Sequence, residues 1–200
     1  RSQLEVKLSY GWAPDPDAPA DVTDWVSGLG DAVVGVKHAL YHDSEAGRIF
    51  SLVGEVILPT GDEARGFGAP GTALEGFATL GHLLPSDAFL QAQAGVEVPL
   101  YDAGSEEAFG RVSLGRTYTE GDWGRSWSPM VEFQAKRELE TGAETVVDLI
   151  PQIQLSLNTR QHVLANVGVL IPTTERDGRS VRLLAYVLLD WFDGGFFEGW

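Results

Sequence analysis

The stretch that decides the fold is Leu90-Gln91-Ala92-Gln93-Ala94-Gly95-Val96-Glu97-Val98. Every second residue from Leu90 to Val98 is apolar, and the residues between them are Gln, Gln, Gly and Glu. Successive side chains of a β-strand point to opposite faces, so this stretch predicts a strand with one apolar and one polar face. The pattern recurs about ten times along the chain, in segments long enough to cross a bilayer when tilted.

Ten strands are expected from this pattern. They cover approximately residues 3–10, 31–41, 48–58, 73–84, 90–98, 108–118, 127–139, 146–157, 162–171 and 180–191. The connections alternate in length: 11–30 and 59–72 are long, whereas 42–47 and 85–87 are short. Such alternation is typical of transmembrane β-barrels, which have short turns on one side of the membrane and longer loops on the other.

Composition is consistent with a single β-barrel domain over residues 1–200. The chain has 24 Gly and 10 Pro, as expected for many strands joined by turns, and it has no Cys. No apolar run approaches the ~18 residues that a membrane helix needs, and a barrel is the membrane architecture that requires no such run. The formal net charge of −15 argues against nucleic acid as a partner.

The direction of the apolar face separates two kinds of barrel. A soluble ligand-binding barrel places apolar side chains inside, whereas a transmembrane barrel places them against lipid. Small and uncharged polar residues alternate with charges of both signs on the polar face, which favours a narrow aqueous lumen. The residues expected to face this lumen are Lys37, Glu55, Glu75, Gln93, Glu97, Arg111, Glu132, Lys136, Asp148, Gln152 and Arg182. Arg116 and His38 fall on the apolar side and count against the transmembrane interpretation unless they lie near an interface.

Aromatic residues gather at the expected strand ends. They are Tyr10, Trp12, Tyr41, Tyr101, Tyr118, Trp123, Trp127, Trp191 and Phe192. Amphipathic rings at those places are typical of the girdles that flank a transmembrane band, although strands of soluble sheets are flanked by aromatics as well.

The sequence predicts no enzyme, cofactor or metal site. His38 and His42 are four residues apart, but on a strand and its turn this spacing does not bring two ligands together. The glycine-rich segment 66–71 is not followed by the Lys and Ser or Thr of a phosphate-binding loop. We expect no catalytic residues.

Three short motifs resemble those of a known family. They are Gly30-Asp31 with Lys37, then Pro59-Thr60-Gly61, and Gly168-Val169-Leu170-Ile171-Pro172. They are similar to motifs of Gram-negative outer-membrane proteins assigned as transporters of the MetA pathway of phenol degradation. The resemblance spans Asp31 to Pro172 and implies an outer-membrane barrel that transports small aromatic or hydrophobic molecules. Members usually carry more chain before the first strand, which implies twelve strands in the full protein.

These observations together predict an all-β, antiparallel, up-and-down transmembrane β-barrel. We expect about ten strands in this chain, a location in the bacterial outer membrane, and activity as a channel or transporter for small molecules. Two alternatives stay open: a structural barrel that anchors a partner protein, and a soluble ligand-binding barrel. The aromatic tail at 193–200, with Phe196, Phe197 and Trp200, would plug the periplasmic mouth or contact such a partner.

Overall fold

The computed structural model describes residues 2–14, 24–102, 104–120, 125–157, 163–176 and 179–189, which form one antiparallel sheet. Its strands are β1 (Ser2–Pro14), β2 (Trp25–Asp43), β3 (Arg48–Leu58), β4 (Ala73–Leu83), β5 (Ala88–Pro99), β6 (Glu107–Arg116), β7 (Tyr118–Glu120), β8 (Arg125–Glu138), β9 (Val146–Ser156), β10 (Val163–Pro172) and β11 (Arg182–Leu189). Each strand pairs with the next in the chain, except that β6 and β7 follow one another along β8. The predicted all-β, up-and-down architecture is confirmed.

The first hairpin is longer than the sequence predicts. Residues 11–30 were expected to form a loop, but β1 extends to Pro14 and β2 begins at Trp25. Gly11 and Gly28, which lie within the expected loop, are directly opposite each other in the ladder. Their missing side chains leave room for the ring of Phe67, because a Cβ at Gly28 would lie 2.8 Å from the Phe67 ring.

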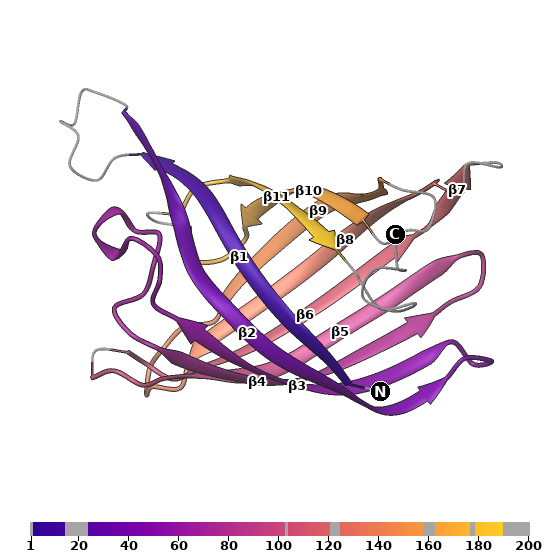
Figure 1. Ribbon diagram of the computed structural model, residues 1–200, viewed down its shortest axis with the longest axis horizontal. Helices are drawn as coiled ribbons and strands as arrows, with labels where there is room; N and C mark the ends of the chain where they lie inside the picture. Colours follow the sequence, from indigo (N-terminus) through magenta and orange to yellow (C-terminus); the bar gives the residue numbers. More distant parts are fainter. Residues whose placement is uncertain are drawn as a thin grey trace.

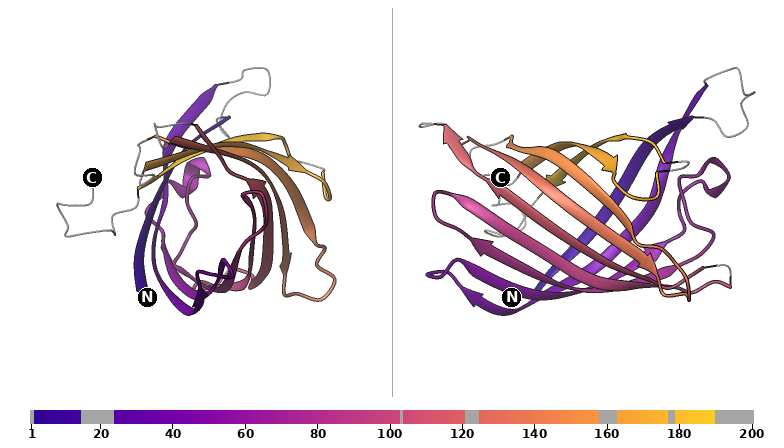
Figure 2. Two further views of the ribbon diagram at one scale, coloured as in Figure 1. Left: turned by 90° about the vertical axis from the view of Figure 1, so that its right-hand side faces the viewer. Right: turned by 180° about the vertical axis from the view of Figure 1, so that it is seen from behind.

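The sheet curls around a central space (Figure 2). Its edges are β1 and β11, and within the described residues no ladder joins these two strands. We call the gap between them the seam. The barrel described by the structure is therefore open along one line.

The two ends of the barrel differ in their connections. The start of β1 and the short connections 44–47 and 84–87 lie at one end, whereas the longer connection 59–72 and the described residues of 173–181 lie at the other (Figure 1). This is the alternation expected from the sequence. A short 3-10 helix, η1 (Glu63–Arg65), lies in the connection 59–72. No helix among the described residues has the length and apolar character needed to span a bilayer.

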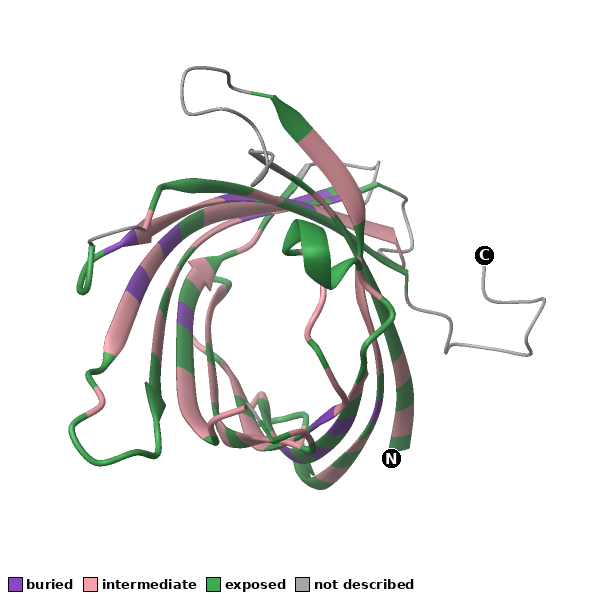
Figure 3. Ribbon diagram, turned by 90° about the vertical axis from the view of Figure 1, so that its left-hand side faces the viewer, coloured by how far each residue is buried: buried purple, intermediate pink, exposed green. Residues whose placement is uncertain are grey.

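The apolar rows lie on the outer face. On the inner face of β3, the side chains of Ser51, Val53 and Glu55 are 1%, 6% and 5% exposed. On the outer face of the same strand, Leu52 and Val56 are 47% and 37% exposed. Figure 3 shows the same banding of exposed and less exposed residues on neighbouring strands. In the described part, the buried aliphatic residues are Val53, Ala73 and Ile150, and Pro172 is buried as well. A soluble barrel would bury its aliphatic rows, and these are exposed.

Pro151 causes a local gap within the sheet. It is opposite Val131 of β8, and the ladder between β9 and β10 lacks pairs at Ile150 and Pro151 while keeping its register on both sides. Proline has no N–H to donate, so a missing rung is the expected consequence.

Candidate functional site: the enclosed polar face

Side chains from non-neighbouring strands converge on the inner face. One hollow of about 270 Å³ is lined by residues of β4, β5, β6, β8, β9 and β11, including Gln91, Glu132 and Gln152. A smaller one of about 50 Å³ is lined by residues of β4, β5, β6, β8 and β9, including Glu75, Arg111 and Asp148. Strands so far apart in the sheet share a hollow only on its concave side, so this polar face is enclosed.

Most of the residues predicted to face a lumen lie on this enclosed face. Glu55 and Asp148 are buried and Gln152 is half-buried. Glu75, Glu97, Arg111, Glu132, Lys136, Asp148 and Gln152 each line one of the two hollows. Gln93 is opposite Thr79 and Arg111, and Lys37 is opposite Gln3 and Val53. Arg182 is opposite Leu170 near the end of β11 with the long connections.

A row of glutamates crosses the enclosed face at one level. Glu55, Glu75, Glu97, Glu107 and Glu138 are successive Cα partners from β3 to β8, and we call them the acidic band. Glu5 continues the row beyond Gly35. Like charges directly opposite one another in a sheet are destabilising, so the band needs cations nearby.

Basic side chains from other positions supply those cations. The Nζ of Lys7 lies 2.6 and 2.8 Å from the two carboxylate oxygens of Glu55, although β2 separates their strands. Lys136 Nζ lies 2.9 Å from Glu107 Oε2. Arg111 shares the smaller hollow with Glu75 and Glu97. The band is therefore only partly neutralised by direct ion pairs.

The other part of the enclosed face is held by neutral donors. Glu132 accepts hydrogen bonds from Ser113 Oγ at 3.1 Å, Gln134 Nε2 at 2.7 Å and Gln152 Nε2 at 3.0 Å. Thr117 and Ser128 are hydrogen-bonded through their hydroxyls at 2.9 Å. All but Gln134 line the larger hollow, which we call the amide chamber.

A charged pair lies near the end with the long connections. Arg179 Nη2 is 2.6 Å from both carboxylate oxygens of Asp148, and Arg179 also donates to the backbone oxygen of Thr174. Asp148 is 6% exposed, so its charge is compensated by a residue of the β10–β11 connection. This contact ties that connection to the inner wall.

A second clamp holds the connection 59–72 over the mouth. Asp31 Oδ1 accepts from the Gly61 N–H at 2.9 Å, and Asp31 Oδ2 accepts from the Ala69 N–H at 2.7 Å. Thr60 Oγ1 accepts from the Ala32 N–H at 2.9 Å. Because Phe67 of this connection lies against Gly11 and Gly28, η1 projects within the outline of the barrel when viewed along its axis (Figure 3). The motifs Gly30-Asp31 and Pro59-Thr60-Gly61 thus meet in space.

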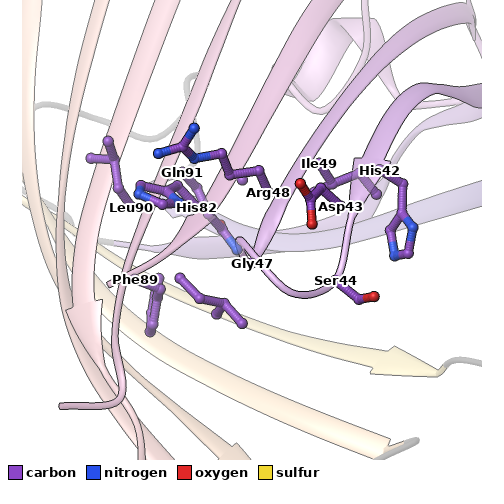
Figure 4. A pocket seen from close by; sticks show the side chains of 12 residues that line it. His42, Asp43, Ser44, Gly47, Arg48, Ile49, His82, Phe89, Leu90 and Gln91 are labelled. Carbon is purple, nitrogen blue, oxygen red and sulfur yellow. The ribbon is translucent and has the colours of Figure 1, made fainter. Parts of the chain in front are cut away.

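A separate hollow of about 420 Å³ lies at the end with the short turns. Figure 4 shows Phe89, Leu90 and Gln91 on one side of it and His42 and Asp43 on the other. His82 Nδ1 is buried here without a hydrogen-bond partner. Within the described residues no group of three or more His, Cys, Asp or Glu is placed to hold a metal.

Arg116 and His38, which the sequence places on the apolar side, lie on the outer face. Arg116 is at the end of β6 next to the short turns, and its guanidinium carbon lies 4.9 Å from the centre of the Tyr118 ring. The His38 ring nitrogen Nδ1 is 2.9 Å from Ser2 Oγ. Rings also pair at the strand ends, where Tyr118 and Trp127 are stacked at 4.5 Å. The tail residues Phe196, Phe197 and Trp200 lie outside the described residues.

Sequence reasoning did not identify Glu107, Arg179 or the clamp role of Asp31. Glu107 begins a strand, and its place in the acidic band depends on the register of β5 with β6. The connection that joins these two strands covers residues 100–106, and its length alone does not determine that register. Arg179 and Asp31 act through connections, whose conformation a two-residue period does not determine.

Comparison with known proteins gives no match for this chain, either among protein-family models or among curated protein sequences.

Proposed function

We propose that this chain is a β-barrel of the bacterial outer membrane that works as a channel or transporter for small molecules. The observation that carries the proposal is the inverted polarity of the sheet, with aliphatic rows exposed outside and carboxylates and amides enclosed. Exposed apolar surface of this extent is unfavourable in water and favourable against lipid. The short and long connections at opposite ends support the same conclusion.

The narrow interior favours the passage of small solutes over free diffusion through a wide, water-filled pore. A barrel of about eight strands is filled by its own side chains, and one of about ten strands is only slightly wider. Here the enclosed space is divided into hollows, and the connection 59–72 overlies one mouth. The resemblance to transporters of the phenol-degradation pathway stays a prediction.

The membrane location is tested by substitutions on opposite faces of β5. Val96 is 43% exposed on the outer face, and Gln93 is on the enclosed face. Val96→Arg lowers the free energy of unfolding in lipid vesicles by about 2–4 kcal/mol if Val96 faces the bilayer midplane. Gln93→Arg is the matched control and has a smaller effect. Equal effects, or a wild-type protein found in the soluble fraction, would contradict the proposal.

The transport activity is tested by conductance in planar bilayers. We expect wild-type protein to give discrete conductance steps, and Glu97→Gln and Arg111→Ala to shift their cation preference in opposite directions. Leu114→Ala, on the outer face, serves as the control and leaves the preference unchanged. A correctly inserted barrel without conductance would favour the structural, partner-anchoring alternative.

A further inference from the structure

The amide chamber contains hydrogen-bonding groups that the fold leaves without partners. Asn166 is 2% exposed, and its Nδ2 has no hydrogen-bond partner. It is the Cα partner of both Gln154 and Tyr186, which line the chamber. Neither of these two side chains has a hydrogen bond within the described residues. Asn166 lies behind the lining of the chamber, whereas Gln154 and Tyr186 present to it an amide and a half-exposed hydroxyl that are free to hydrogen-bond to a ligand.

The chamber also has an apolar wall. Phe89 and Met130 line it together with Leu83. Gly115 lies under the first two, because a Cβ at that position would be 2.5 Å from Phe89 Cζ and 2.7 Å from Met130 Cβ. Because Gly115 has no side chain, the Phe89 ring packs directly on the sheet at this position. A ligand here therefore meets an aromatic surface as well as amides and hydroxyls.

The charge of the chamber favours a neutral ligand. Among the described lining residues Glu132 is the only one with a full charge, and it already accepts from three neutral donors. An anion would be repelled by this carboxylate, with no lining cation to balance it. A cation would have to displace donors that already satisfy Glu132.

We propose that the amide chamber binds a neutral, polyhydroxylated molecule of the size of a monosaccharide. Ligand hydroxyls accept a hydrogen bond from the amide nitrogen of Gln154 and donate to its amide oxygen and to the hydroxyl of Tyr186. The carbon-bound hydrogens of such a ring pack on Phe89. The volume of about 270 Å³ accommodates one small ring compound. The inference rests on the proposed function for its biological meaning, since it names the solute class that the barrel would carry.

Binding is tested with purified protein in detergent micelles, using D-glucose as the probe and saturation-transfer NMR as the readout. We expect saturable binding, weakened about fivefold by either Gln154→Leu or Tyr186→Phe, because each variant removes one hydrogen-bonding partner. Gln93→Leu is the matched control, because Gln93 is on the enclosed face but does not line the chamber. Retained heat-dependent gel migration shows that each variant is folded.

Three outcomes would overturn the inference. They are no saturable glucose binding by the folded protein, gluconate binding as tightly as glucose, or Gln93→Leu weakening binding as much as Gln154→Leu. A barrel that inserts and conducts but does not bind glucose would leave the proposed function standing. A chain that binds glucose in micelles but never inserts into bilayers would contradict the membrane function alone.

Discussion

In the acidic band, five glutamates lie side by side and depend on long Lys and Arg side chains from other positions for charge balance. Around Glu132, one carboxylate is held by three neutral donors at 2.7–3.1 Å. The first arrangement depends on ion pairs and is sensitive to ionic strength, whereas the second depends on hydrogen bonds from neutral donors. Under the proposed channel function, we expect the acidic band to set the preference for charged solutes and the amide chamber to set the preference for solute shape and hydrogen bonding.

The largest effect is expected where a buried charge loses its partner. Lys7→Ala leaves Glu55, whose side chain is 3% exposed, without its ion pair, and we expect the free energy of unfolding to fall by about 3 kcal/mol. Urea unfolding in lipid vesicles measures it. Lys136→Ala is the control, because its partner Glu107 is 23% exposed, and this variant should lose less than about 1 kcal/mol. Equal losses of unfolding free energy in the two variants would show that the greater burial of Glu55 does not make its ion pair more important for stability than the Lys136–Glu107 pair.

In the amide chamber, a neutral substitution should have a smaller effect. Gln152→Leu removes one of the three donors to Glu132, and we expect a loss of about 2 kcal/mol in the free energy of unfolding. The same urea experiment applies, with Gln93→Leu as the control. A loss no greater than that of the control would mean that water replaces the Gln152 donor without penalty.

At the mouth above the acidic band, the clamp should affect a single connection. Asp31→Ala removes acceptors for two backbone N–H groups, so we expect a loss of about 1 kcal/mol and faster trypsin cleavage after Arg65, which is exposed. Glu63→Ala, in the same connection, is the matched control. Unchanged cleavage in Asp31→Ala would show that the clamp does not hold this segment.

The smallest expected effect is that of salt on the free energy of unfolding, and it tests the difference between the acidic band and the amide chamber. At about 1 M salt the Debye length is roughly 3 Å, so the difference between wild type and Lys7→Ala should shrink by up to about 1 kcal/mol. The difference between wild type and Gln152→Leu should stay the same. Parallel changes in both variants would contradict the assignment of the two regions to different interactions.

The two-residue period was enough to locate ten strands and their faces, but not the full length of β1 and β2 or the short strand β7. Once β3 is an extended strand, Leu52 and Val56 must point to the other face from Ser51 and Glu55, and the structure places them so. The alternating lengths of the connections indicated the two ends. These features depend on local chain geometry, which is why a single sequence reveals them.

Features that depend on pairing between different strands or loops could not be predicted from the sequence in the same way. The acidic band exists because register aligns Glu75 with Glu97 and Glu97 with Glu107. The extended first hairpin depends on Phe67, which fills the space over Gly11 and Gly28 from a different connection. In both cases the determining partner lies on another strand or loop, and alternation along one strand carries no information about it.

The seam has a consequence for what can bind to the two edge strands. In the described part of the sheet, β1 and β11 have no strand on their outer sides, so each presents a row of backbone N–H and C=O groups. In water those rows would recruit strands from other copies, and in hydrocarbon they could not stay bare. The two edge strands are therefore the places in the described sheet where an added strand would find backbone groups ready to pair.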